Sequence, residues 1–111
     1  MQDSLEIARA AQKAAEDKKG EDVIILDIRE IADFADYFVL ATGKNRNQME
    51  AMADAVDEAL IKGGAVHKCT EGNKDSGWIL MDYGDVIVHL FDEESRSFYD
   101  LERIWKDGKA V

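Results

Sequence analysis

The chain has 111 residues, of which 46% are apolar, and its 24 acidic and 14 basic side chains give a formal net charge of −10. This size and apolar content predict a single folded domain over residues 1–111, and no apolar run is long enough to cross a membrane. The negative charge argues against direct binding of nucleic acid and favours a basic protein partner, although acidic surfaces also serve solubility alone.

The first predicted element is a helix within residues 1–20. Asp3 or Ser4 is its expected N-cap, and Glu6 completes a capping box after Asp3. The basic and glycine residues from Lys18 to Gly20 end it. Its apolar stripe is narrow, so we expect a docked helix without deep burial; the stripe consists of Leu5, Ala8, Ala11 and Ala15.

Signals of export are absent from the start of the chain. The N-terminal stretch is charged and lacks the apolar segment of a secretory signal. The chain has one cysteine, Cys69, which suits a reducing compartment. We therefore expect a cytoplasmic protein.

Two apolar runs predict buried strands, Val23 to Ile28 and Tyr37 to Ala41. A second helix follows, capped by Asn45 or Asn47 and ended by the residues from Lys62 to Gly64. Its predicted buried face repeats at helical spacing and contains Met49, Met52, Ala53, Val56 and Leu60.

A third strand is predicted from Ala65 to Thr70, and the polar stretch from Glu71 to Gly77 reads as a loop. A hairpin follows, with strands from Trp78 to Asp82 and from Val86 to Phe91. Gly84 supplies the positive φ that its tight turn requires.

Asp92 is the expected N-cap of a third helix, whose apolar face contains Phe98, Leu101 and Trp105. Residues 106–111 lack apolar periodicity and are expected to fray. The order αββαβββα predicts an α/β fold of the α+β type, with a five-stranded mixed sheet packed with three helices. The pattern does not determine the strand order.

The residue types that build metal and catalytic sites are sparse. His67 and Cys69 alternate on one predicted strand and His89 lies on another, which falls short of a four-ligand zinc site. A Cys–His nucleophile pair has no visible orienting group or oxyanion donor. We expect no metal, no cofactor and no catalytic residue.

Nucleotide chemistry has only weak support. A nucleotidyl transferase needs converging carboxylates, often Asp-x-Asp beside a Gly-Ser turn, and neither motif is present. The turn from Thr42 to Lys44 precedes a helix and could face an anion, but it lacks the phosphate-binding loop pattern.

The strand that begins at Trp78 has two faces, and neither is plainly polar. Trp78, Leu80 and Asp82 alternate with Ile79, Met81 and Tyr83. Either helices cover both faces, or another protein covers one of them. The pattern alone favours burial within the fold, although tryptophan is enriched where interfaces gain most of their energy.

Several segments resemble the ribosomal silencing factor family (RsfS, also called YbeB or Iojap). They are DYFVLATG at 36–43, DYGDVIVHLF at 82–91, EESRSFYDLERIW at 93–105 and the Glu-Gly pair that precedes Trp78. The resemblance implies a nucleotidyltransferase-like fold without transferase activity, so the protein is not expected to be an enzyme.

The resemblance also implies a partner and a mechanism. Family members bind ribosomal protein uL14 on the joining face of the large subunit, block the small subunit and repress translation when nutrients are scarce. They often form homodimers. The implied contact residues are Trp78, Ile79, Met81 and Tyr83, and we add three acidic residues that can pair with a basic partner: Glu71, Asp82 and Asp85. Two other hypotheses stay open, a residual nucleotide-binding or transferase activity and a dimerising scaffold that pairs through a sheet edge.

Overall fold

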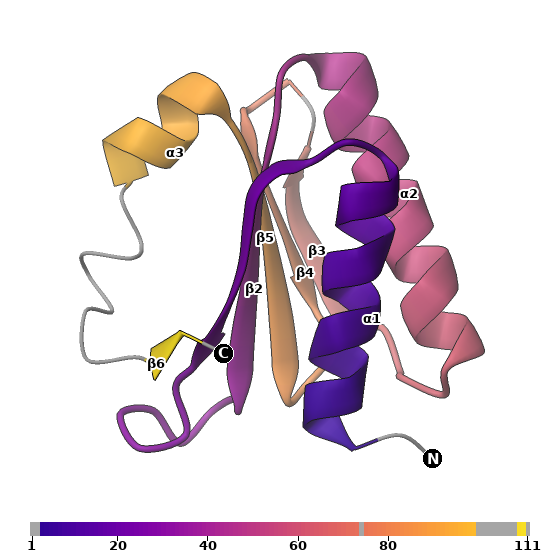
Figure 1. The fold of residues 1–111 in the computed structure, drawn as a ribbon, viewed down its shortest axis with the longest axis vertical. Coiled ribbons are helices and arrows are strands. Elements are labelled where there is room, and N and C mark those ends of the chain that lie inside the picture. The colour runs from indigo at the N-terminus through magenta and orange to yellow at the C-terminus, as the bar shows by residue number, and fades with distance from the viewer. Residues whose placement is uncertain (1–2, 74, 100–108, 111) are drawn as a thin grey trace.

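Strands from both halves of the chain form one mixed sheet in the computed structural model, which describes residues 3–73, 75–99 and 109–110 (Figure 1). The strand order is β3-β4-β5-β2-β1-β6. Neighbouring strands are antiparallel except β2 and β5, which are parallel. The strands are β1 (Glu21–Asp27), β2 (Tyr37–Gly43), β3 (Cys69–Asn73), β4 (Trp78–Asp82), β5 (Val86–Asp92) and β6 (Lys109–Ala110), and the helices are α1 (Ser4–Asp17), α2 (Arg46–Lys62) and α3 (Glu93–Tyr99).

The predicted α+β class and the order αββαβββα are confirmed for the five main strands and three helices. The short strand β6 was not predicted. Its two residues pair with Leu26 and Asp27 at the β1 edge, within the segment 106–111 that was expected to fray; the other residues of that segment lie outside the described part of the chain. Backbone pairing with an edge strand requires no apolar periodicity, which explains why the pattern gave no signal.

Helices α1 and α2 lie side by side on one face of the sheet, whereas α3 lies on the other (Figure 1). The Asp3 carboxylate accepts the backbone N–H of Glu6 at 2.9 Å, so Asp3 is the N-cap of α1. The alanine stripe is fully buried, contrary to the expectation of shallow docking: Ala8, Ala11 and Ala15 are 0% exposed. Small side chains let the helix axis approach closely enough to exclude water.

Helix α2 follows the prediction closely. Asn45 is its N-cap and accepts the backbone N–H of Gln48 at 2.8 Å. Four residues of the predicted apolar face are fully buried: Met49, Met52, Val56 and Leu60. Within the described part of the chain, no helix has both the length and the apolar character needed to cross a membrane.

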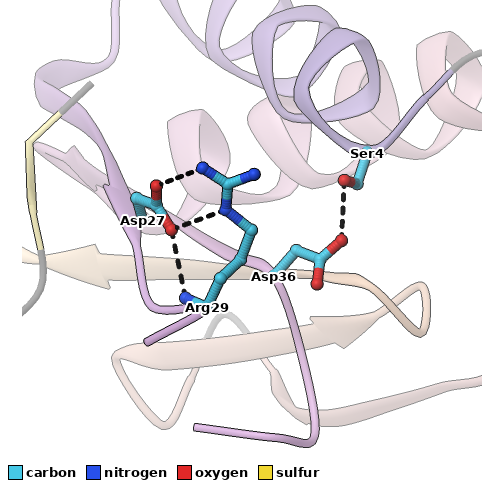
Figure 2. Close-up of polar contacts among 4 residues, drawn as sticks. All are labelled: Ser4, Asp27, Arg29 and Asp36. Atoms are coloured by element: carbon cyan, nitrogen blue, oxygen red, sulfur yellow. Dashed lines mark hydrogen bonds and ion pairs between the residues drawn. The ribbon is translucent and has the colours of Figure 1, made fainter. Parts of the chain in front are cut away.

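The connection between β1 and β2 is fixed at both ends (Figure 2). The Asp27 carboxylate accepts the backbone N–H of Arg29 at 3.0 Å and binds its guanidinium at 2.8 Å. Ser4, in the first turn of α1, donates its hydroxyl to Asp36 at 2.8 Å. These contacts hold the segment 28–36 so that Ile28 is buried on the face opposite α1 and α2.

The third strand is displaced along the sequence from its predicted position. It begins at Cys69 rather than Ala65 and continues to Asn73, so Glu71 lies in a strand and not in a loop. Pairing with β4, from Cys69 opposite Asp82 to Asn73 opposite Trp78, sets these limits. The residues from Cys69 to Gly72 are exposed, so apolar content does not mark this strand.

Candidate functional site

Alternate residues of β4 point to opposite faces of the sheet and meet different surroundings. Ile79, Met81 and Tyr83 are 5%, 3% and 7% exposed and belong to the cluster beneath α1 and α2. Trp78 and Leu80 are half-buried and pack against a second cluster on the other side. The sequence left two arrangements open: helices on both faces of β4, or helices on one face and another protein on the other. In the described part of the chain, the layer formed by α1 and α2 covers one side of β4.

This arrangement places part of the expected contact set beneath the helix layer. The resemblance implied that Ile79, Met81 and Tyr83 contact a partner, but the helix layer covers all three side chains. The reason is strand geometry, because residues next to Trp78 in sequence point away from it. Only Trp78 of the four residues taken from the family reaches the open face, by which we mean the side of the sheet opposite α1 and α2.

Cross-strand pairs place the side chains of the open face. Trp78 is opposite Phe91 and Leu80 is opposite His89 on β5, while Glu71 of β3 is opposite Leu80 on its other side. Directly opposed residues share a face, so these five side chains lie on the same side of the sheet. Helix α3 packs on this side mainly against β5 and β2.

The Trp78 indole lies against two aromatic rings of β5. It stacks on Phe91 with ring centroids 5.5 Å apart and planes at 21°, and on His89 at 5.9 Å and 28°. Its Nε1–H donates to Nδ1 of His89 at 3.2 Å. Because the indole has a single polar donor and that donor is already bonded, the part of the ring that stays exposed is aromatic and apolar.

A groove runs beside the indole, lined by Glu71, Gly72, Ser76, Trp78 and Leu80. Gly72 has φ +75°, and a Cβ there would lie 2.1 Å from the carbonyl oxygen of Trp78, so glycine is required. The Glu71 residue is exposed at the side of this groove. An aromatic wall beside a carboxylate suits a side chain with an aliphatic stem and a positive end.

The start of β4 is tied to the start of α3. Asp92 donates its backbone N–H to the carbonyl of Gly77 at 3.0 Å, and its carboxylate accepts the backbone N–H of Ser95 at 2.7 Å. The second bond confirms Asp92 as the helix cap. The predicted apolar face of this helix, Phe98, Leu101 and Trp105, lies outside the residues whose side chains are described.

The two remaining acidic residues of the expected contact set lie at the other end of β4. The carboxylate of Asp82 accepts the backbone N–H of Gly84 at 2.7 Å and so stabilises the hairpin turn, where Gly84 has the predicted positive φ of +86°. Asp85 is exposed, and its carbonyl accepts the backbone N–H groups of Asp36 and Tyr37. The structure therefore brings Glu71 into the groove with Trp78 and places Asp82 and Asp85 at the turn.

His67 takes part in a polar cluster at α2 rather than in a site with Cys69. The Asp57 carboxylate accepts the Tyr83 hydroxyl at 2.6 Å and lies 3.2 Å from Nδ1 of His67. His67 Nε2 lies 2.6 Å from the Thr70 hydroxyl. Burial, together with the bond to Asp57, raises the pKa of Tyr83. No group of three metal-ligating side chains occurs among the residues described, and these bonds join α2 to the start of β3.

The loop between β2 and α2 contains the turn from Thr42 to Lys44, which had only weak support from the sequence as an anion site. The backbone N–H of Lys44 donates to the Gln48 side chain at 2.6 Å, and the Lys44 ammonium pairs with Glu21 at 3.0 Å. The adjacent groove has an acidic lining around one cation and contains Glu21, Asp22, Thr42, Glu93 and Arg96. The Arg96 guanidinium donates to the Thr42 hydroxyl oxygen at 2.9 Å. Such a lining disfavours the phosphates of a nucleotide.

Sequence reasoning missed Leu80, His89 and Phe91 as parts of the site. The alternation of β4 was visible and already paired Leu80 with Trp78. The contributions of His89 and Phe91 depend on the register between β4 and β5, which the sequence pattern does not state residue by residue.

Comparisons with known proteins agree with this architecture. Residues 1–111 match the family model described as ribosomal silencing factor during starvation. A ribosomal silencing factor of Bacillus subtilis is 38% identical over 102 residues, covering 92% of this chain and 86% of that protein.

Two solved structures are also similar. A crystal structure from Chromobacterium violaceum superposes with a TM-score of 0.90 at 34% identity, covering 95% of this chain and 88% of that one. One from Bacillus halodurans has a TM-score of 0.84 at 32% identity, covering 97% of this chain and 98% of that one. With a family match over its whole length and close relatives in both sequence and structure, this chain belongs to the ribosomal silencing factor family.

Proposed function

We propose that the protein binds the large ribosomal subunit through ribosomal protein uL14 and, while bound, prevents the small subunit from joining. Family membership supports an association with ribosomes. The observation that carries the proposal is the half-buried Trp78, which lies on the side of the sheet opposite α1 and α2 and beside the Glu71 carboxylate. Tryptophan is prominent among the residues that dominate binding energy in protein interfaces.

Steric exclusion requires only that the protein occupy the joining face. The protein extends over 31 × 31 × 22 Å. A typical specific interface buries about 800 Å² on each partner. A protein of this thickness on the joining face would hold the two subunits much farther apart than the side-chain contacts between them can span. Subunit joining and binding of the silencer therefore exclude each other. The protein then acts as a non-enzymatic repressor of translation, at ribosomes in the cytoplasm.

Charge favours a basic protein as the direct contact. The net charge of −10 repels the phosphates of ribosomal RNA, whereas Glu71 can pair with an arginine or lysine whose stem lies along Trp78. Asp82 and Asp85, at the hairpin turn, extend the negative potential along the same strand. These groups mainly speed the encounter and select the partner, since exposed ion pairs add little affinity.

Binding to purified components tests this proposal directly. We expect the protein to co-sediment with purified large subunits, to remain in the supernatant with small subunits, and to bind isolated uL14 in calorimetry. Absence of binding to large subunits in physiological buffer would overturn the proposal. If the protein bound large subunits but not isolated uL14, the proposed silencing role would stand, and the direct contact would be another component of the large subunit.

We also propose that the free protein forms homodimers, as the family resemblance implies. In the described part of the chain, the edge strand β3 pairs with β4 alone and is exposed from Cys69 to Gly72, which leaves an edge available to a second copy. Light scattering over a dilution series tests this. A constant monomer mass up to the highest concentration would contradict it.

The alternative function, a residual nucleotide-binding or transferase activity, is tested by calorimetry with ATP, CTP and GTP in the presence of Mg²⁺. The acidic groove around Thr42 and Arg96 leads us to expect no heat of binding at millimolar nucleotide. A saturable heat, or turnover of any of the three nucleotides, would favour the alternative.

A further inference from the structure

His89 occupies an unusual environment on the open face. It is 4% exposed and lies among aromatic rings, with Phe38 at a centroid distance of 4.7 Å in an edge-on arrangement and Trp78 at 5.9 Å. Nδ1 accepts the indole N–H of Trp78 at 3.2 Å. Nε2 has no hydrogen-bond partner and is the single buried side-chain nitrogen or oxygen in this condition among the described residues.

These contacts determine the tautomer of the ring. The indole N–H can only donate, so Nδ1 of His89 carries no proton. Burial lowers the pKa of His89 to about 4, and the ring is therefore neutral at neutral pH with its proton on Nε2. Among the described residues this buried donor has no acceptor, which is unfavourable. A leucine at this position would avoid that cost but would offer no acceptor to the indole.

We propose that His89 is a positioning residue that holds the Trp78 indole in its binding orientation through the Nε1–H to Nδ1 hydrogen bond. The inference rests on the proposed function, in which Trp78 is the central contact. Stacking on Phe91 restrains the tilt of the indole, and the bond to His89 fixes its rotation in the plane of the stack. A ring ordered before binding loses less conformational freedom when the partner docks, so affinity is higher without any contact between His89 and the partner.

Two substitutions separate the acceptor from the rest of the ring. His89→Leu keeps an apolar side chain of similar volume and removes the acceptor. His89→Asn keeps an acceptor on the atom that corresponds to Nδ1, because both are attached to Cγ. The measurements are thermal unfolding, co-sedimentation with purified large subunits, and the indole ¹H–¹⁵N resonance of Trp78, assigned as the one missing from the spectrum of Trp78→Phe.

The expected results for the two variants differ. His89→Leu should fold, shift the Trp78 resonance upfield, speed its exchange with solvent and bind large subunits roughly tenfold more weakly. His89→Asn should retain the bonded resonance and bind within about threefold of wild type. This rescue is the result that a purely structural role of the imidazole does not produce.

Three outcomes would overturn the inference: unchanged binding by His89→Leu, equal weakening in both variants, or a Trp78 resonance that does not respond to His89→Leu. If His89→Leu does not fold, the test rests on His89→Asn. A His89→Asn protein that has lost the hydrogen bond to Trp78, as its indole resonance reports, but binds large subunits with full affinity would contradict the inference. Wild-type protein that fails to bind large subunits would instead overturn the proposed function, and the resonance would still report whether His89 holds the indole.

Discussion

The two faces of the sheet differ in how their apolar side chains are covered, although both are built by the same strands. On one face, α1 and α2 bury Ile79, Met81 and Tyr83. On the open face, the Phe91 and His89 rings are also buried, at 0% and 4% exposed, whereas Trp78 and Leu80 beside them are half-buried. Successive residues of β4 therefore meet different surroundings: one set is buried beneath the helices, and the other is the set that we propose contacts a partner. Substitutions on the two faces should separate stability from binding.

Met81→Ala should give the largest change in stability. Met81 is 3% exposed beneath the helices, and truncation of a buried methionine lowers the free energy of unfolding by about 2–5 kcal/mol. Urea unfolding followed by circular dichroism measures this change. The folded fraction should bind large subunits with wild-type affinity. A specific loss of affinity in the fully folded variant would mean that the covered face takes part in binding.

Trp78→Ala should give the converse result. We expect the affinity for large subunits to fall about 100-fold, which corresponds to about 2.7 kcal/mol, with a smaller loss of stability than Met81→Ala shows. Ile61→Ala is the matched control, because Ile61 is a large apolar residue that is 48% exposed on α2, on the opposite side of the sheet. Equal affinities for the two variants would remove the distinction between the faces.

The pH dependence of stability, compared between wild type and a His89 variant, probes the open face. His89 has its pKa lowered by burial from 6.5 to about 4, so the unfolded chain takes up a proton between these values and the folded chain does not. Stability should therefore fall as the pH decreases from about 6.5 towards 4, and the His89 contribution at pH 5 is about 2 kcal/mol. The difference in unfolding free energy between wild type and His89→Leu, measured at pH 7 and pH 5, isolates this contribution. A difference that does not change with pH would show that His89 titrates normally.

Glu71→Gln should produce the smallest effect. Removal of one rim charge is expected to lower the association rate with large subunits by about two- to fivefold at low salt, and the effect should disappear at high salt. Glu58→Gln makes the same charge change on the exposed side of α2 and serves as the control. Stopped-flow measurements at two ionic strengths test whether the effect is local to Trp78. Equal rates for the two variants would show that only the net charge matters.

The features predicted well from the sequence are those set by local patterns. The buried face of α2, the Gly84 turn and the Asp92 cap follow from residue spacing and from backbone conformations that few residues adopt. Features that depend on pairing between distant segments were missed or misplaced. β3 is defined by its bonds to β4, and β6 by its bonds to β1, so neither has a pattern of its own.

The site shows the same division. Alternation in β4 was apparent, but it did not reveal which face the helices cover, since both faces are apolar. The family resemblance was applied to a whole segment at once. The expected contact set therefore included, beside Trp78, three residues that are buried: Ile79, Met81 and Tyr83. The partnership of Trp78 with His89 needed the three-dimensional register of β4 and β5.

The most direct test of the account is the joining of purified small and large subunits, followed on sucrose gradients at a magnesium concentration that supports joining. We predict that wild-type protein reduces the joined particles in proportion to its occupancy of large subunits, that Ile61→Ala does the same, and that Trp78→Ala at equal concentration leaves joining intact. Unimpaired joining with wild-type protein bound, or full inhibition by a folded Trp78→Ala variant, would contradict a silencer that acts by occupying the joining face through its open sheet surface.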